Sequence, residues 1–342
     1  MRVLSVVGNR PQFIKSAPLS AGLRDAGIEE IALHTGQHYD RALSQVFYDE
    51  LGLGEPRYRL DVRQADPSKM VPGIREAVER ERPDWVLVFG DTNSTLAGAQ
   101  AAGATPVAHV EAGLRSFDLS MPEERNRIAV DRISSLLLCP DERSAAQLES
   151  EGVSGRREVV GDVMRDALDM FGPIADRLRP TRPSRYALLT IHREANTEPQ
   201  RLRRLIEELN GTGWSFVFPV HPRTRQVLDE NEIPLSPEIE PVEPQGYLEL
   251  LALLRGATHL VTDSGGLQKE AYWLQIPCVT LRTSTEWVDT VAAGANTLVD
   301  PDAPSNLGHV LENATFPADA PQLYGDGQAS RRIAGALYAS RP

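Results

Sequence analysis

Short apolar runs rich in β-branched residues alternate along the chain with segments of helical periodicity. In the first half, these runs predict strands at residues 3–8, 30–35, 85–90, 105–110, 135–139 and 158–161. Helices are expected between them, and the first carries Leu19, Leu23 and Ala26 on one face. Apolar strands that alternate with helices are typical of a parallel sheet covered on both faces. The first half is therefore predicted to be an α/β domain.

A Pro- and Arg-rich segment, residues 171–183, interrupts this pattern, and we expect the domain linker there. A second α/β series follows. Its strands are predicted at residues 186–191, 214–220, 259–262 and 277–281, and the last helix at 329–338. Two tandem α/β domains are thus expected, and ligand sites favour the interface between such domains.

The composition is that of an ordinary globular protein, with 41% hydrophobic and 25% charged residues. The formal net charge of −12 disfavours nucleic acids and anionic membranes as partners, because repulsion opposes both. Cys139 and Cys278 lie at the edges of apolar runs and are expected to be buried thiols. The sequence has no Cys/His cluster with the spacing of metal ligands, so a structural metal site is not expected. The first strand is too short to be a signal peptide or a membrane span. A cytoplasmic location is expected.

Acidic residues gather at strand ends and at a helix start in the first half. Asp91 and Glu111 each follow a predicted strand, and Glu123 and Glu124 open a predicted helix. Carboxylates at the carboxyl ends of parallel strands face the ligand crevice. Each also has a structural interpretation, Asp91 in a capping turn and the glutamates at a helix start. Gathered in one cleft, such carboxylates can supply one acid and one base.

Two loops in front of predicted helices offer phosphate sites. Residues 8–12, GNRPQ, follow the first strand and offer Arg10 and backbone N–H groups, with Lys15 further along the helix. In the second half, residues 262–270 form a strand end, a glycine-rich turn and a helix start. This turn offers a diphosphate the N–H groups of Ser264, Gly265 and Gly266, while Glu270 is placed to accept hydrogen bonds from sugar hydroxyls.

Histidine and arginine end two predicted strands of the second half. They stand at His192-Arg193 and around His221, which precedes Arg223. One strand-end histidine is usually structural, but two such endings suggest a cationic wall for phosphate oxygens. Arg282 and Glu286 complete the rim of this predicted site, although Ser284 with Glu286 and Asp289 could simply start a helix.

Together these stretches resemble the non-hydrolysing UDP-N-acetylglucosamine 2-epimerases over nearly the whole chain. The motifs that carry the resemblance are GNRPQFIKSAPL, GDTNSTLAGA, HVEAGLRSFD with MPEERNR, GDVMRDAL, IHRE, PVHP, EPQGYLELL, TDSGGLQKEA, RTSTEW and YGDGQAS. The pairing of TGQHYD with RTSTEW resembles the branch that includes UDP-2,3-diacetamidoglucuronate 2-epimerases.

The resemblance implies two Rossmann-like domains that face each other across a cleft, as in GT-B glycosyltransferases. The first domain is expected at residues 1–168, with a C-terminal helix, 328–342, crossing back to it. The second, which binds UDP, is expected at 169–327. A homodimer is also expected from the family.

The resemblance further implies reversible inversion at C2 of a UDP-2-acetamido sugar, such as UDP-GlcNAc to UDP-ManNAc. UDP is eliminated to leave a glycal and is then added back, without a cofactor or a metal. By motif, Asp91, Glu111 and Glu123 handle the C2 proton, and His192 supports the departing diphosphate. The contacts to the UDP-sugar carried over by motif are Arg10, Lys15, Gln245, Ser264, Gly265, Gly266, Glu270 and Arg282.

The chain departs from the family pattern at a few positions. Its first loop reads GNRPQ where GTRPE is familiar, Ala195 replaces an acidic residue, and Leu250 replaces an aromatic one. Which UDP-sugar is the substrate stays open. Two alternatives share much of the pattern or the fold, a hydrolysing 2-epimerase that releases UDP and a GT-B glycosyltransferase. A non-catalytic nucleotide-sugar sensor is disfavoured, because all three carboxylates are present.

Overall fold

The computed structural model describes residues 1–37, 54–60, 62, 64, 66–178 and 185–341. The side chain of Arg10 and residues 38–40 of the TGQHYD motif lie outside the described part. The chain divides into two compact units. Unit 1 comprises Met1–Met170 with Tyr324–Pro342, and unit 2 comprises Phe171–Leu323.

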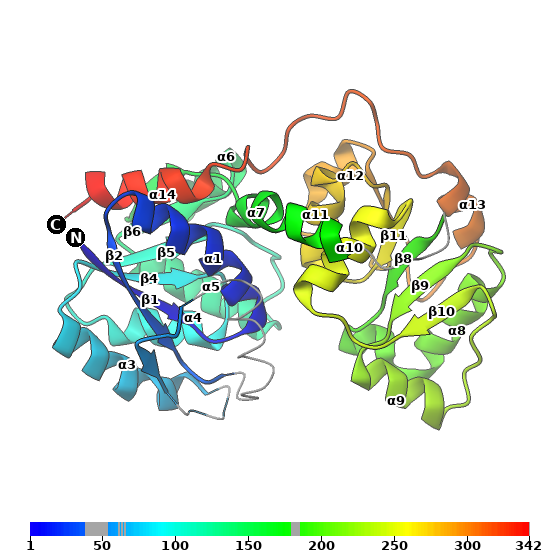
Figure 1. Cartoon of the computed structure of the whole chain (residues 1–342), viewed down its shortest axis with the longest axis horizontal. Coiled ribbons are helices and arrows are strands. Elements are labelled where there is room, and N and C mark those ends of the chain that lie inside the picture. The colour runs from blue at the N-terminus through cyan, green and yellow to red at the C-terminus, as the bar shows by residue number, and fades with distance from the viewer. Residues whose placement is uncertain (38–53, 61, 63, 65, 179–184, 342) are drawn as a thin grey trace. The chain divides into compact units, whose positions relative to one another are not determined.

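Unit 1 is built around a parallel seven-stranded sheet in the order β3-β2-β1-β4-β5-β6-β7 (Figure 1). The strands are β1 (Arg2–Val7), β2 (Glu29–His34), β3 (Tyr58–Arg59), β4 (Trp85–Phe89), β5 (Val107–Val110), β6 (Leu136–Cys139) and β7 (Arg156–Val159). The helices are α1 (Arg10–Asp25), α3 (Pro67–Glu81), α4 (Asn93–Ala101), α5 (Pro122–Ile133), α6 (Glu142–Ser150), α7 (Val163–Leu178), which runs on into unit 2, and α14 (Ala329–Ala339). The strand order reverses between β1 and β4, which makes their carboxyl ends the topological switch point.

Unit 2 repeats this topology in a six-stranded parallel sheet, β10-β9-β8-β11-β12-β13. Its strands are β8 (Ala187–Thr190), β9 (Phe216–Pro219), β10 (Ile239–Val242), β11 (His259–Thr262), β12 (Cys278–Thr280) and β13 (Asn296–Leu298). Its helices are η1 (Glu194–Thr197), α8 (Pro199–Asn210), α9 (Pro222–Glu230), α10 (Tyr247–Gly256), α11 (Gly265–Trp273), α12 (Val288–Ala292) and α13 (Leu307–Asn313). The switch point here lies between β8 and β11.

The central strands are buried on both faces, as the apolar runs predict. Residues 86–89 of β4 have no exposed surface, and β4 pairs in parallel with both β1 and β5. Each predicted strand is present, and the α/β class with two Rossmann-like sheets is confirmed. Strands β3, β10 and β13 are not predicted by the apolar pattern. All three lie at sheet edges, where short and partly exposed strands lack a long apolar run.

The two units divide between Met170 and Phe171, at the start of the predicted linker 171–183, but the first part of this segment is helical because α7 continues to Leu178. Pro173 lies inside this helix. The helix persists because Leu168, Phe171 and Ala175 recur at helical spacing and are buried, so packing outweighs the cost of the proline. Residues 179–183 of the predicted linker lie outside the described residues.

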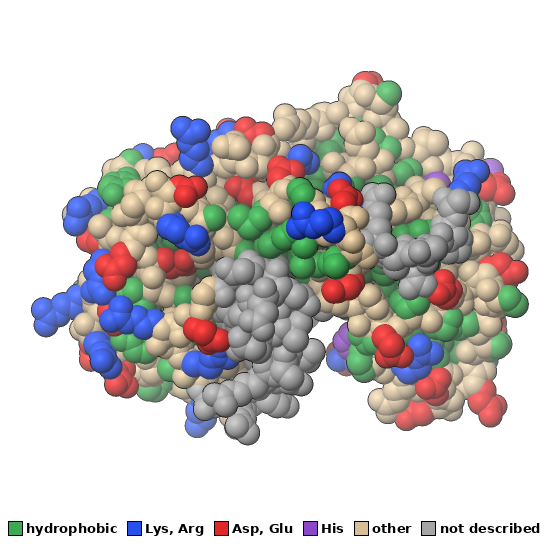
Figure 2. Space-filling model, viewed as in Figure 1, with side chains coloured by type: hydrophobic (Ala, Val, Ile, Leu, Met, Phe, Trp, Pro, Cys, Tyr) green, Lys and Arg blue, Asp and Glu red, His purple; other side chains and the backbone are tan. Residues whose placement is uncertain are grey.

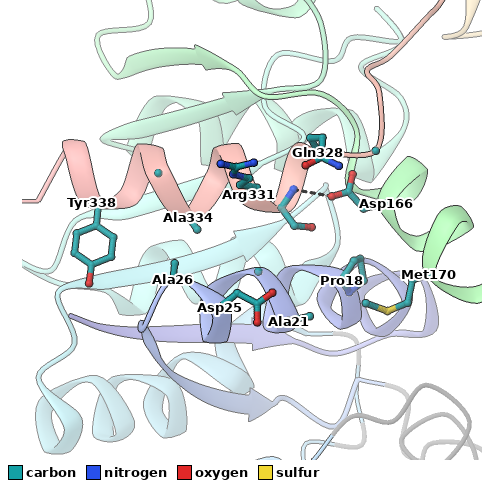
Figure 3. A pocket seen from close by; sticks show the side chains of 14 residues that line it. Pro18, Ala21, Asp25, Ala26, Asp166, Met170, Gln328, Arg331, Ala334 and Tyr338 are labelled. Atoms are coloured by element: carbon teal, nitrogen blue, oxygen red, sulfur yellow. Dashed lines mark hydrogen bonds between the residues drawn. The ribbon is translucent and has the colours of Figure 1, made fainter.

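The C-terminal helix α14 returns to unit 1 and packs beside α1 (Figure 1). Asp166 caps α14 by accepting hydrogen bonds from the backbone N–H groups of Ala329 (3.1 Å) and Ser330 (2.8 Å). A groove of about 630 Å³ runs between the two helices, with Asp25, Arg331 and other residues along it (Figure 3). No predicted site residue that the structure describes lines this groove.

Acidic and basic side chains lie interspersed on the face of the described residues that Figure 2 draws. No helix in the described ranges is long and apolar enough to cross a membrane. Over the same residues, no group of three or more His, Cys, Asp and Glu side chains is placed to hold a metal ion.

Candidate active site

Asp91 and Glu111 lie at the carboxyl ends of the adjacent strands β4 and β5, beside the switch point of unit 1. Thr92 caps α4 by accepting a hydrogen bond from the N–H of Thr95 (3.2 Å), which fixes the turn that carries Asp91. Glu111 has a left-handed backbone, with φ of 67°, and its N–H donates to the carbonyl of Leu138 (3.1 Å). Local backbone geometry therefore sets the direction of both carboxylates.

Each of these carboxylates has a cationic partner. Lys15 Nζ pairs with Glu111 Oε2, and Arg127 Nη2 pairs with Asp91 Oδ2. Gly90 separates the two pairs. A side chain there would place its Cβ 3.3 Å from Glu111 Oε2 and 3.6 Å from Lys15 Nζ. The structure thus brings together Lys15, Asp91 and Glu111 around Gly90.

The two glutamates at the start of α5 differ. Glu123 is exposed, whereas Glu124 is buried. Glu124 Oε2 accepts hydrogen bonds from the N–H and Oγ of Ser116 (both 3.0 Å), and its Oε1 accepts one from the N–H of Phe117 (3.1 Å). Glu124 also pairs with Arg127. Glu124 thus connects the loop after β5 to Arg127, the partner of Asp91. The sequence alone indicates only a helix-start charge at Glu124.

A buried polar chain supports this turn from behind. His109 Nε2 lies 2.7 Å from the carbonyl oxygen of Gly90, and Nδ1 lies 2.7 Å from Asp131 Oδ1. The other oxygen of Asp131 accepts a hydrogen bond from Arg115 (2.7 Å), which also pairs with Glu151. Burial alone raises the pKa of Asp131, but His109 and Arg115 outweigh it and lower the pKa.

The first loop is less open to phosphate than the sequence suggests. Gln12 Oε1 accepts hydrogen bonds from the N–H groups of Gly8 (2.8 Å) and Asn9 (3.3 Å), and Asn9 caps Gln12 in return. These N–H groups are satisfied within the loop. Arg10 begins α1, so a phosphate role there depends on a side chain outside the described part.

In unit 2, His192 and residues 264–266 follow the paired strands β8 and β11 at the switch point. Asp263, which the sequence analysis did not single out, connects them. Its carboxylate is buried and contacts both the backbone and the ring of His192. The N–H of Ser264 donates to Thr262 Oγ1 (2.9 Å) rather than pointing to a ligand.

Gly265 begins α11 against a carboxylate. A Cβ at Gly265 would lie 2.5 Å from Glu286 Oε1, whereas a Cβ at Gly266 would meet nothing within 4 Å. Glu286 Oε2 accepts a hydrogen bond from Arg282 Nη1 (2.9 Å). Burial alone raises the pKa of Glu286, but the charge of Arg282 helps to lower it overall. The structure thus brings Arg282 and Glu286 to the N-terminus of α11.

Glu270 is buried inside α11, where its Oε1 accepts a hydrogen bond from the hydroxyl of Tyr247 (3.1 Å). Burial and the nearby carboxylate raise the pKa of Tyr247 well above its ordinary value, so the phenol stays a donor. Gln245 is half-buried just before α10, and its Nε2 donates to the carbonyl of Glu243 (2.6 Å).

The ring of His221 adds little positive charge to the predicted cationic wall. Burial first, and then the charges of His192 and Arg223, lower the pKa of His221, so its ring is neutral near neutral pH. His221 caps α9, and its Nδ1 accepts a hydrogen bond from the N–H of Arg223 (3.2 Å). The ring centroids of His192 and His221 lie 6.3 Å apart.

Two open parallel sheets, each with charged side chains at its switch point, place this chain in the class of α/β proteins that bind ligands of the nucleotide type at the carboxyl ends of their strands. A family model described as UDP-N-acetylglucosamine 2-epimerase matches residues 21–338. The chain therefore belongs to that family. The recognised family is confirmed, and with it the enzyme class and C2 epimerisation of a UDP-sugar.

Individual relatives match over nearly their whole length. A UDP-N-acetylglucosamine 2-epimerase homolog of Methanococcus maripaludis is 42% identical, over 98% of this chain and 99% of that protein. A UDP-2,3-diacetamido-2,3-dideoxy-D-glucuronate 2-epimerase of Pseudomonas aeruginosa is 41% identical, over 98% of each. The solved structure of Methanocaldococcus jannaschii UDP-GlcNAc 2-epimerase in complex with UDP-GlcNAc and UDP has a TM-score of 0.88 and 35% identity. It covers 99% of this chain and 100% of that one.

Proposed function

We propose that this chain inverts C2 of a UDP-2-acetamido sugar by eliminating UDP and adding it back, with Asp91, Glu111 and Glu123 transferring the proton. The main support is the pair of carboxylates at the ends of β4 and β5, each held by a cation beside the switch point. Proton transfer to and from carbon needs such positioned acids and bases.

In the proposed reaction, a carboxylate removes the C2 proton while the C1–O bond breaks and its electron pair leaves with UDP. The C1=C2 double bond of a glycal forms. A proton then returns to the other face of C2, and a UDP oxygen attacks C1. Negative charge develops on UDP, and His192, Arg282 and the N-terminus of α11 are the donors proposed to stabilise it.

The names of the relatives suggest two candidate substrates. The M. jannaschii structure contains UDP-GlcNAc and UDP, and the P. aeruginosa relative is named for a diacetamido-glucuronate sugar. We propose that this chain acts on UDP-GlcNAc or on a close 2-acetamido derivative of it. The remaining UDP-sugar contacts are proposed from Lys15, Gln245, Gly265, Gly266 and Glu270, together with Arg10 and Ser264.

Proton NMR in D2O tests the proposal. With UDP-GlcNAc, we expect deuterium to enter C2 and UDP-ManNAc to form. Release of free N-acetylmannosamine with UDP would identify a hydrolysing enzyme instead. Unchanged C2–H signals with both UDP-GlcNAc and the diacetamido-glucuronate sugar would overturn the proposal.

We also propose that the chain works as a homodimer in the cytoplasm, as the family resemblance suggests. Cys139 and Cys278 are buried and form no disulfide with each other, which suits a reducing compartment. Light scattering coupled to size exclusion tests the dimer, and a monomeric mass at micromolar concentration would contradict it.

A further inference from the structure

Asp263 is a fully buried carboxylate directly behind a half-exposed histidine. It follows β11, and the side chain of His192, which follows β8, is 42% exposed. A buried carboxylate is costly unless its oxygens accept hydrogen bonds, so the partners of Asp263 reveal why it is there.

The two oxygens of Asp263 have different partners. Oδ2 accepts hydrogen bonds from the backbone N–H groups of His192 (3.0 Å) and Arg193 (2.9 Å) and from Asn196 Nδ2 (3.3 Å). Oδ1 lies 3.0 Å from His192 Nδ1 and 3.2 Å from the N–H of His192. Oδ2 is thus fixed by the backbone, and Oδ1 is the oxygen that faces the ring.

This contact selects one tautomer of His192. Burial alone raises the pKa of Asp263, but the hydrogen bond and charge of His192 and the backbone donors lower it overall. An ionised carboxylate only accepts hydrogen bonds, so Nδ1 carries the hydrogen. The lone pair of the neutral ring then lies on Nε2, at the edge away from Asp263.

The neighbouring histidine has the opposite arrangement. Nδ1 of His221 accepts the N–H of Arg223, so the hydrogen of its neutral ring is on Nε2. Two histidines at adjacent strand ends are therefore held in different tautomers by different partners. Of the two, His192 is the one whose Nε2 can take up a proton and then donate it to an oxygen.

We propose that Asp263 is the positioning residue that fixes the orientation and tautomer of His192, so that Nε2 faces the leaving diphosphate. The inference rests on the proposed function for the role of His192. The tautomer itself does not depend on any activity and is measured separately. Asp263 touches no reacting atom and acts through the ring.

The Asp263→Asn variant tests the positioning role, because the backbone N–H donors determine which position the amide oxygen takes and which the amide nitrogen takes. The amide oxygen must take the place of Oδ2, since two N–H groups point at it. The NH2 group then faces His192 Nδ1, which has to become an acceptor, and the hydrogen moves to Nε2. Thr224→Val is the matched control. It removes the hydrogen bond from Thr224 Oγ1 to the carbonyl of Ile191 (2.7 Å), beside His192, without touching the ring.

The direct readout is long-range ¹⁵N–¹H correlation on the full chain with labelled histidine, at about pH 9, where an ordinary imidazole is neutral. A His192→Gln variant assigns the signal. We expect an Nδ1–H ring in the wild type and in Thr224→Val, and an Nε2–H ring in Asp263→Asn. An Nε2–H ring in the wild type overturns the proposal whether or not the variants fold.

The kinetic readout is kcat against KM for the UDP-sugar. Asp263→Asn should lower kcat about 10- to 1,000-fold, with KM within about threefold. This loss is smaller than the roughly 100- to 10,000-fold that a general acid or base itself contributes, because Asp263 acts only through the ring of His192. Thr224→Val should keep kcat within about threefold. A switched tautomer with near-normal kcat would overturn the positioning role. An inactive wild type with an Nδ1–H ring would instead count against the proposed function.

Discussion

Single side chains at the strand ends determine what the proposed chemistry can do. Asp91 and Glu111 have cationic partners, whereas Glu123 is exposed. Their positions were predictable, because each directly follows an apolar strand or opens a helix. Three supporting side chains were not predictable: Arg127, which pairs with Asp91, Glu124, which holds the loop after β5, and Asp263, which contacts His192. Their roles depend on side-chain contacts that neither spacing nor periodicity encodes.

Removing the proton-transfer groups should lower turnover without weakening binding. For Asp91→Asn and Glu111→Gln, we expect kcat to fall about 100- to 10,000-fold, because a positioned acid or base contributes that much. KM should change little. Glu149→Gln, at an exposed carboxylate on α6, is the control and should keep wild-type kinetics. Steady-state assays of UDP-sugar epimerisation measure all three, and near-normal kcat in either variant removes that residue from the proton-transfer set.

Alanine substitutions at the adjacent glycines Gly265 and Gly266 give a second matched pair of variants. Gly265→Ala forces a Cβ to within 2.5 Å of Glu286 Oε1 and should displace Glu286 together with its partner Arg282. Gly266→Ala enters open space. Isothermal titration with UDP should therefore show affinity at least about tenfold weaker for Gly265→Ala, the cost of roughly one hydrogen bond to a charged group, and little change for Gly266→Ala. Equal affinities in the two variants would show that Glu286 moves freely.

Whole helices and strands were predicted where burial gives them a clear pattern. Central strands are apolar throughout and were found, whereas edge strands such as β10, which contains Pro241, look like loops in sequence. Pro173 had the opposite effect. It indicated a linker, but buried positions on both sides keep α7 intact. Tertiary burial, which the sequence shows only indirectly, decided both cases.

The buried chain of His109, Asp131, Arg115 and Glu151 joins β5, α5, α6 and the loop after β5, so it should stabilise these elements together. The pKa of Asp131 is below its unfolded value of about 3.9. Its stabilisation is therefore present above about pH 4 and is lost as the pH falls through the lower folded pKa. At neutral pH, Asp131→Asn should cost about 1 to 3 kcal/mol, because His109 and Arg115 lose a charged acceptor while Arg115 keeps its pair with Glu151.

Urea unfolding at several pH values measures this effect. The wild type should lose its advantage over Asp131→Asn as the pH drops below about 4. Asp302→Asn, which breaks an exposed pair with Arg201, should change the unfolding midpoint far less. A constant difference between wild type and Asp131→Asn down to the lowest pH would mean that the charge of Asp131 is not what stabilises these elements.

The molecule as a whole consists of two units whose first six strands follow the same order and whose switch points carry different charges. Unit 1 contributes paired carboxylates, and unit 2 contributes His192, Arg282 and the glycine turn of α11. The proposed reaction breaks the bond between sugar and diphosphate. We therefore propose that the carboxylates act on the sugar side of this bond and the donors of unit 2 on its diphosphate side.

This division of roles predicts that UDP alone is held by unit 2. Arg282→Ala should weaken UDP binding by about tenfold or more, the loss of a charge-assisted hydrogen bond. Asp91→Asn should bind UDP within about threefold of the wild type although its turnover collapses, because a carboxylate on the sugar side gains nothing from an anion. Calorimetric titration of UDP compares them. Equal losses of UDP affinity in Asp91→Asn and Arg282→Ala would contradict this division, because Asp91 would then contribute to binding of the diphosphate. The carboxylates would in that case not act only on the C2 proton.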